Sequence, residues 1–331
     1  MNTIPFAKPY LPLSVRSEAV QKYQTMIDNV SDGSARISNG ENVEKLEEVV
    51  AKLSGADHAV ACSSCTQAMV LGLGACGVGG EGHTASFTWD STAISMNMQG
   101  SHVTMHDIDL EKWVVPSYEV GADPHTGGGY AVAVDTFGLQ HNPVSMVPLF
   151  YDRAHSMGQK FRQIGLASFL SLSPSKIVTG GEGGIILCNK ERFVKAMRMG
   201  RDIMCRMPEA NAILALEGLK HIGELLEWKR DTYNFYKQKL PFIFQDCAGG
   251  SNHQVIGMLL DSHEQQDKLR EIQDVEFRFY YEPLHKRSKE YEKCQLPNTM
   301  SVFERIVCLP SWMGVNREYV VERIKEVLEN D

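Results

Sequence analysis

Residues 147–188 read VPLFYDRAHSMGQKFRQIGLASFLSLSPSKIVTGGEGGIILC, and this stretch decides the fold. It contains three apolar runs, 147–152, 166–172 and 184–188, each of a length typical of a buried strand. A glycine-rich segment separates the second run from the third. Short apolar strands that follow one another in this way predict a sheet that is covered on both faces.

Strands and helices alternate along most of the remaining chain. Further strands are predicted at 58–62, 102–106 and 130–134. Helices are predicted at 43–53, ending at Gly55, and at 65–76, 90–99 and 192–199. This alternation predicts an α/β fold with a mainly parallel central sheet.

A long helical pattern from Glu209 to about Lys239 precedes a smaller α/β unit. Within that unit, strands are predicted at 255–260, 274–281 and 303–309, and helices at 264–272 and 318–329. We place the division within or just after the long helix. The prediction is therefore a large domain, 1–235, and a small C-terminal α/β domain, 236–331.

Composition narrows the class of protein. A chain of 331 residues that is 43% hydrophobic can bury one large core and a smaller one. The formal net charge of −8 argues against a general nucleic-acid binder, which needs a basic surface, although a local basic pocket for a phosphate remains compatible. The N-terminal residues lack a signal-peptide pattern, and no apolar run is long enough to span a bilayer. We therefore expect a cytoplasmic protein with no membrane or nucleic-acid partner, whose eight cysteines are reduced.

Asp152 closes the first apolar run and Lys176 follows the second. A lysine and a carboxylate in these places suit pyridoxal phosphate (PLP) chemistry. The lysine amine condenses with the cofactor aldehyde as a Schiff base, and the carboxylate keeps the pyridine nitrogen protonated so that the ring can accept electrons. The two residues together, rather than either alone, indicate this cofactor.

The turn Ser63-Ser64-Cys65-Thr66-Gln67 lies where a predicted strand meets a predicted helix. Ser64, Cys65 and Thr66 would there offer backbone N–H groups, hydroxyls and the positive end of the helix dipole to a phosphate. Ser171, which precedes Lys176, could add a further hydroxyl. Two alternatives remain open: simple N-capping by Ser64 or Thr66, and a redox or metal role for the C-x-x-C motif that Cys65 closes.

Trp89 and His155 complete the predicted cofactor contacts. Trp89 is the candidate to stack on the pyridine ring, and His155, three residues after Asp152, could touch the cofactor from the side. Their simpler interpretations are a core aromatic and a hydrogen-bonded core histidine. Residues 106–109, His-Asp-Ile-Asp, lack the further ligand spacing of a metal site, so no metal is predicted. The basic run 286–289 is either a solvated face or a contact for a nucleotide diphosphate.

Taken in order, these motifs resemble the DegT/StrS-type sugar aminotransferases, which are fold-type I PLP-dependent enzymes. The resemblance covers nearly the whole chain. It is carried by residues 4–9, 42–47, 64–68, 87–89, 152–155, 171–184, 283–285 and 309–310.

The resemblance implies the aspartate aminotransferase fold and a homodimer with active sites near the subunit interface. Members of the family move an amino group from L-glutamate or L-glutamine to a keto group of a nucleotide-linked sugar. Lys176 corresponds to the lysine that forms the Schiff base and then moves a proton between substrate and cofactor. The residues that correspond to cofactor contacts are Ser64, Cys65, Thr66, Trp89, Asp152, His155, Ser171 and Lys176.

Alternatives to transamination remain open. A sister branch of sugar dehydratases has histidine at the lysine position, so Lys176 favours transamination. The other possibilities are a PLP enzyme with a different reaction, dehydration or decarboxylation, and a non-catalytic or regulatory protein that keeps the fold.

The chain departs from the family in several places. The segments 138–150 and 200–208 are short, and a covering helix in the first is predicted to be missing. Individual replacements are Asp135 for a common histidine, Ile177 and Pro208 for asparagines, and Cys65 for the glycine of the phosphate turn. We therefore expect intact cofactor machinery beside a remodelled and more open substrate pocket.

Overall fold

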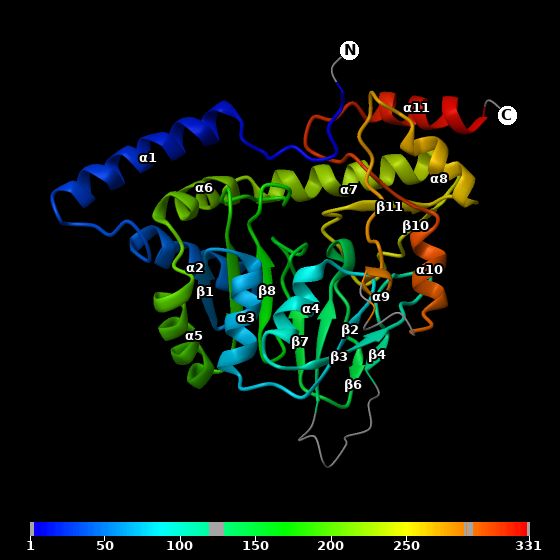
Figure 1. The fold of residues 1–331 in the computed structure, drawn as a ribbon. Coiled ribbons are helices and arrows are strands. Elements are labelled where there is room, and N and C mark those ends of the chain that lie inside the picture. The colour runs from blue at the N-terminus through cyan, green and yellow to red at the C-terminus, as the bar shows by residue number, and fades with distance from the viewer. Residues whose placement is uncertain (1–2, 119–128, 288, 290–293, 330–331) are drawn as a thin grey trace.

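A seven-stranded sheet forms the centre of the molecule (Figure 1). The computed structural model describes residues 3–118, 129–287, 289 and 294–329. The strands, in spatial order, are β1 (His58–Cys62), β9 (Gly184–Cys188), β8 (Ser168–Ser171), β7 (Leu149–Asp152), β5 (Tyr130–Val134), β2 (Glu81–Ala85) and β3 (His102–His106). Only β9 is antiparallel to its neighbours, so the predicted mainly parallel sheet is confirmed.

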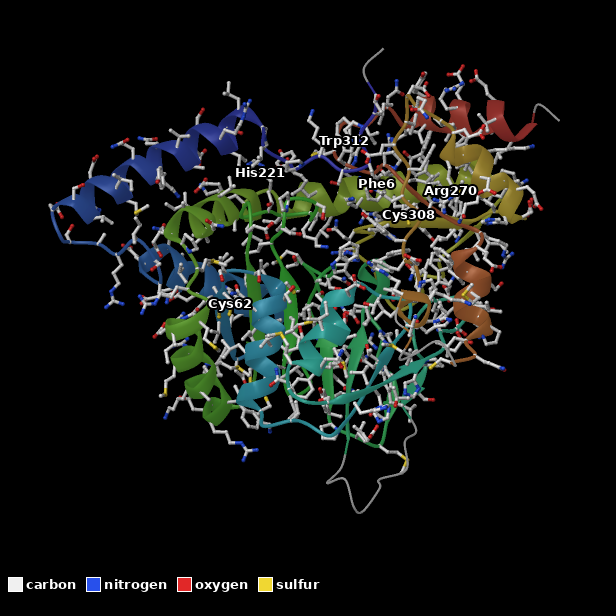
Figure 2. All side chains as sticks on the ribbon, viewed as in Figure 1. Phe6, Cys62, His221, Arg270, Cys308 and Trp312 are labelled. Carbon is white, nitrogen blue, oxygen red and sulfur yellow. The ribbon has the colours of Figure 1, made fainter. Side chains whose placement is uncertain are left out.

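Helices cover the sheet in two apolar layers. One layer contains α3 (Cys65–Ala75), α4 (Asp90–Asn97) and α5 (Glu191–Met204), and the other contains α2 (Glu41–Ser54) and α6 (Glu209–Leu219). Successive side chains of a strand point to opposite faces, so Val60 packs in the first layer while Ala59 and Ala61 pack in the second. Figure 2 shows side chains filling the space between the helices and the sheet.

The apolar positions of the sequence explain α2 in detail. Val43, Leu46 and Val50 lie on one stripe of the helix and are fully buried. The helix stops at Gly55, whose φ of 74° is the left-handed conformation that glycine adopts without strain. The prediction of this helix and of its end is confirmed.

The C-terminal part contains a three-stranded antiparallel sheet of β10 (Ile243–Phe244), β11 (Ile256–Leu259) and β12 (Ile306–Leu309). Its helices are α8 (His263–Arg270), α9 (Leu284–Arg287), α10 (Pro297–Phe303) and α11 (Arg317–Glu329). Helix α7 (Ile222–Lys239) connects the two parts, and the predicted division at 235/236 falls inside it. The division into two domains stays a prediction.

Three predicted elements differ from the structure. The long helical pattern from Glu209 is two helices, α6 and α7, which are separated at Lys220 and His221. The predicted strand 274–281 is wrong: it pairs with Ile4 at one point and with Cys308 at another, and this change of partner prevents a continuous ladder. The predicted strand 303–309 begins only at Ile306, because α10 continues to Phe303.

One helix was not predicted, and one connection is short, as predicted. Helix α1 (Leu13–Ser31) extends away from the main body and packs on α6 (Figure 1). The connection from β5 to β7 lacks a covering α-helix, as predicted. Its residues, all within the described part, form only the 3-10 turn Thr136–Gly138 and the short strand β6 (Val144–Ser145), which pairs with β4 (Ser117–Tyr118).

The N-terminal segment lies against the C-terminal part. The Trp312 indole nitrogen donates a hydrogen bond to the Pro5 carbonyl at 2.9 Å, and Phe6 follows directly (Figure 2). Phe6 and Trp312 line the cavity that is described below. The two ends of the chain therefore contribute to the same site.

Candidate active site

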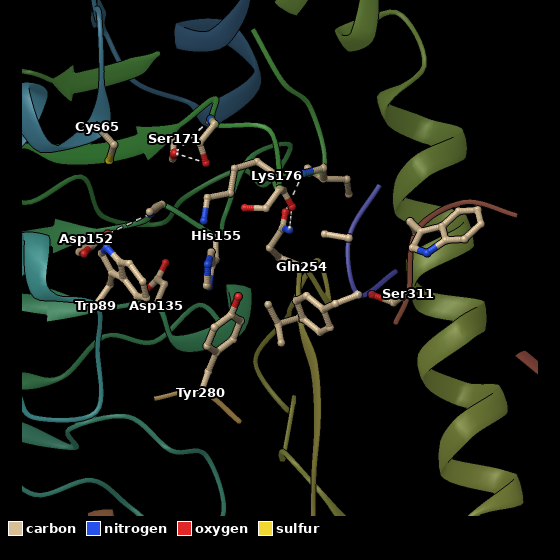
Figure 3. Close-up of a pocket in the computed structure, with 18 of the residues that line it drawn as sticks. Cys65, Trp89, Asp135, Asp152, His155, Ser171, Lys176, Gln254, Tyr280 and Ser311 are labelled. Atoms are coloured by element: carbon tan, nitrogen blue, oxygen red, sulfur yellow. Dashed lines mark hydrogen bonds between the residues drawn. The ribbon is translucent and has the colours of Figure 1, made fainter. Parts of the chain in front are cut away.

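A cavity of about 350 Å³ lies beside the carboxyl ends of the parallel strands (Figure 3). Loops that follow β2, β5, β7 and β8 contribute to it, which is where open α/β sheets bind their ligands. All of the site residues predicted from the sequence line this one cavity: Ser64, Cys65, Thr66, Trp89, Asp152, His155, Ser171 and Lys176. Their roles stay predictions, but the structure places them together.

Asp152 is the last residue of β7 and is 5% exposed. Its carboxylate accepts hydrogen bonds from the Thr92 hydroxyl at 2.7 Å and from the Ala154 backbone N–H at 3.1 Å. Burial raises the pKa of Asp152, while these hydrogen bonds and the charge of Lys176 act in the opposite direction. A cation brought to this carboxylate would favour its ionised form.

Lys176 lies in the loop after β8 and points into the cavity (Figure 3). Gln254 holds this loop from both sides: its side chain accepts a hydrogen bond from the Ile177 N–H at 2.7 Å and donates one to the Ser175 carbonyl at 2.9 Å. Desolvation lowers the pKa of Lys176, against the charges of Cys65 and Asp152. A lowered pKa increases the fraction of neutral amine, the form that attacks a carbonyl carbon.

The N-terminus of α3 forms the opposite wall. Ser64 is its N-cap and accepts a hydrogen bond from the Gln67 N–H at 3.2 Å, so the N-capping interpretation is correct for this residue. Ser64, Cys65 and Thr66 also line the cavity, so capping does not exclude a ligand contact. Gly184 faces them closely: a Cβ there would lie 2.5 Å from the Cys65 backbone, so the approach of β9 requires glycine.

Trp89 precedes α4 and is 56% exposed, so it is not an ordinary core aromatic. The His155 ring stacks on Tyr281, with a centroid distance of 6.4 Å, and its Nδ1 lies 3.4 Å from the Tyr281 hydroxyl. Burial lowers the pKa of His155 well below its usual value, so the ring is neutral at neutral pH. Both side chains face the cavity between Asp152 and Lys176 (Figure 3).

These residues fit PLP. A phosphate would meet the N-terminus of α3 together with the hydroxyls of Ser64, Thr66 and Ser171. A pyridine ring would meet the Trp89 indole, and its nitrogen would face the buried carboxylate of Asp152. The amine of Lys176 lies in the same cavity and is available to the aldehyde.

Other motifs have structural partners instead. Cys62 is buried in the core while Cys65 lines the cavity, and all eight cysteines are free thiols. Asp107 caps α10 by accepting hydrogen bonds from Asn298 and Thr299, and the described residues contain no group of three or more possible metal ligands. In the basic run 286–289, of which residue 288 lies outside the described residues, Arg287 pairs with Asp90 at 2.7 Å.

One departure from the family, Asp135, lies in the wall of the cavity. Asp135 follows β5 and forms a buried ion pair with Arg153 at 3.0 Å. Arg153 also packs its guanidinium on the Tyr151 and Phe161 rings and donates hydrogen bonds to Ser168 and to the Gln163 carbonyl. The Asp135–Arg153 pair therefore links the residues that directly follow β5 and β7.

Sequence reasoning missed four polar residues of the site. Thr92 lies one helical turn after Trp89, so the period of α4 could have indicated it. Gln254, Lys229 and Ser311 come from distant elements, and no local pattern marks them. They reach the cavity only because the C-terminal part packs against it.

A family model matches residues 18–328 of the chain. The chain belongs to the DegT/DnrJ/EryC1/StrS aminotransferase family. A curated relative, the dTDP-4-amino-4,6-dideoxy-D-glucose transaminase of Shigella dysenteriae, is 24% identical over 88% of this chain and 91% of its own.

Two solved structures have the same fold. A structure of DesI with its TDP-sugar product has a TM-score of 0.83 at 22% identity, covering 94% of this chain and 88% of DesI. A GDP-4-keto-6-deoxymannose-3-dehydratase with a trapped PLP-glutamate geminal diamine has a TM-score of 0.83 at 17% identity, covering 98% and 100%. The predicted family, the PLP-dependent fold type I and the aminotransferase class are confirmed. Within the described residues, no helix is long and apolar enough to cross a membrane.

Proposed function

We propose that this protein uses PLP to move an amino group from glutamate or glutamine to a keto group of a nucleotide-linked sugar. One observation carries the proposal: a single cavity contains the Lys176 amine, the buried Asp152 carboxylate and the hydroxyl-rich N-terminus of α3. The sugar transaminase among the relatives supports the substrate class.

Each residue has a distinct task in this proposal. PLP, when bound, supplies an electron sink for the carbon that gains or loses the amino group. Asp152 holds positive charge at the ring nitrogen, and Thr92 fixes the carboxylate. Lys176 moves a proton at the reacting carbon, and the lowered pKa of its amine increases the fraction that is free to accept one. Trp89 and His155 hold the ring in place.

The test follows the visible absorbance band of the bound cofactor in the purified protein. L-Glutamate or L-glutamine should convert this band to that of the aminated cofactor and release the corresponding 2-oxo acid. A keto-sugar nucleotide should then restore the band. A band that persists with every amino donor would instead favour a non-catalytic protein.

Dehydration is the second candidate function, because a sugar dehydratase shares the fold. Lys176 counts against it, since the resemblance places histidine at this position in the dehydratase branch. Analysis of the product separates the two reactions: transamination leaves nitrogen on the sugar, whereas dehydration removes an oxygen and leaves none.

We also propose a cytoplasmic homodimer. Large apolar side chains are exposed on α1 and α5, at Leu13, Val20, Met199 and Ile203. Such side chains favour a second copy as their partner. Light scattering at several protein concentrations tests this, and a mass equal to one chain throughout would contradict it.

A further inference from the structure

A second lysine, Lys229 of α7, lines the same cavity and is 8% exposed. Its ammonium group donates to the Ser311 hydroxyl at 2.7 Å and to the Gln254 carbonyl at 2.9 Å. Both acceptors are neutral, and no carboxylate of the described residues forms an ion pair with this amine. An ammonium group has three donors, so one remains for another partner.

This arrangement is costly without an anion. A buried charge is stabilised mainly by an opposite charge, and hydrogen bonds to neutral groups compensate only in part. Burial lowers the pKa of Lys229 to about 7. Its neighbour Arg230 shows the contrast, because it is exposed and lies 3.5 Å from Glu227.

Gln254 forms hydrogen bonds both to Lys229 and to the residues on either side of Lys176. Gln254 accepts from Lys229 with its backbone carbonyl and holds the residues on both sides of Lys176 with its side chain. In an α-amino acid, the carboxylate is one bond from the carbon that carries the amino group. An amino donor that reacts in this cavity, beside Lys176, must therefore bring an anion into it.

We propose that Lys229, together with the Ser311 hydroxyl, binds a carboxylate of the amino donor. The inference rests on the proposed function, because it requires an amino acid as one substrate. A nucleoside diphosphate is the less suitable anion: the sugar ring separates it from the reacting keto carbon, and it needs several donors rather than one ammonium.

Other titratable groups also line the cavity, and among them the Lys8 amine lies over the Trp312 ring, 4.9 Å from its centroid. These groups are Lys8, Cys65, Asp135, Asp152, His155, Lys176, Glu182 and three tyrosines. Two histidines are affected by the charge of Lys229: His155 in the cavity wall and His253, which stacks on Tyr233. Burial lowers the pKa of His253 to about 4 and that of His155 well below its usual value, so both are neutral at pH 7.

The test measures glutarate binding by calorimetry, because this dicarboxylate has neither an amino nor a keto group. Lys176→Ala serves as the background, which removes catalysis and the titration of Lys176. In two buffers of different ionisation enthalpy at about pH 7.5, binding should take up roughly three quarters of a proton, as expected for an amine with a pKa of about 7.

Lys229→Met in this background should weaken glutarate binding roughly tenfold or more and abolish the proton uptake. Lys229→Arg should keep binding without uptake, which also guards against a Met variant that fails to fold. Arg230→Met is the matched control and should leave both quantities unchanged.

Glutarate binding that is equal in Lys229→Met and its background would overturn the inference, as would dTDP binding that depends on Lys229 while glutarate binding does not. The proposed function has its own readout in the wild type. If the wild type transfers amino groups but the Lys229 substitutions leave glutarate binding unchanged, this inference is wrong and the proposed function stands. Lys229-dependent glutarate binding without amino transfer defeats the proposed function alone.

Discussion

Asp152 ends β7 and Asp135 follows β5, its parallel neighbour. Each carboxylate lies near a cation, yet the two pairs differ in one respect. Asp135 contacts Arg153 directly at 3.0 Å, and the Ser156 hydroxyl and His141 Nδ1 each lie 3.3 Å from its carboxylate. Asp152 and Lys176 influence each other's pKa, but they form no ion pair in the described structure. Both carboxylates line the cavity, but the Asp135 pair is closed by a direct ion pair, whereas Asp152 and Lys176 are open because they do not contact each other.

The difference separates stability from chemistry. A closed pair satisfies both charges inside the protein and leaves neither for a ligand. An open pair leaves a carboxylate and an amine facing the same space, with shifted pKa values of the kind that accumulate at functional sites. We therefore expect substitutions in the open pair to change activity and substitutions in the closed pair to change stability.

Lys176→Ala should have the largest effect on activity. Loss of the amine removes both the attachment of the cofactor and the proton transfer, and the latter alone contributes roughly 10²–10⁴-fold to a rate. Amino transfer and the visible band of the lysine-bound cofactor should disappear together. The urea midpoint of the cofactor-free protein should stay close to that of the wild type, because the side chain forms no ion pair in the described structure; a large drop would contradict the comparison.

Asp152→Asn should reduce the rate by roughly 10²–10³-fold, the usual cost of removing one preorganised electrostatic contact. Because burial raises the pKa of Asp152, the ionised carboxylate opposes folding above its ordinary pKa, and its stabilising contribution is present only at lower pH. The neutral amide should therefore leave the cofactor-free protein equally stable, or more stable, at pH 7. Steady-state kinetics and urea unfolding measure the two effects, and a parallel loss of rate and stability would count against the open pair.

The closed pair should behave in the opposite way. Arg153→Met leaves Asp135 buried without its cation, and Asp135→Asn leaves the guanidinium without its anion. Each should cost about 3–5 kcal/mol of unfolding free energy. The double variant should cost less than the sum, since it leaves no unpaired charge. Urea unfolding of all four proteins gives the coupling energy, and additive costs would show that the pair is not closed.

The sequence predicts correctly those strands and helices whose pattern of apolar residues lies within the element itself. Strands β1, β3, β5 and β9 have the predicted bounds. β1, β5 and β9 are compact and mostly apolar runs, and β3 alternates, with Val103 and Met105 buried between more exposed residues. Strand β2, Glu-Gly-His-Thr-Ala, was missed because its residues have little strand propensity and its burial comes from its place between β5 and β3. Helix α1 was missed because only Val15 and Met26 are buried, so its apolar stripe is weak.

The residues of the site also fall into those that a local sequence pattern predicts and those that only the structure brings together. Its predicted residues follow strands that the sequence already indicated, so their convergence at one sheet edge could be expected. Gln254 could not be expected, because it is 77 residues away from Ile177 in the chain. The Asp135–Arg153 pair was also beyond the sequence: Asp135 was recognised as a departure, but only the structure shows which cation it meets.

Gln254→Ala should give the smallest loss of activity, and it tests what holds Lys176 in place in the open pair. The open geometry requires something other than an ion pair to hold Lys176, and the Gln254 side chain is the only group of the described structure with hydrogen bonds to both flanking residues. Its removal leaves the buried Ile177 N–H without its acceptor, at a cost of about 1–3 kcal/mol. Hydrogen exchange should quicken at this amide, and kcat should fall less than in Asp152→Asn. Gln254→Glu keeps the acceptor for Ile177 and should restore the protection of that amide; an Ile177 amide that exchanges as slowly in the alanine variant as in the wild type would show that the loop is held by its own turn instead.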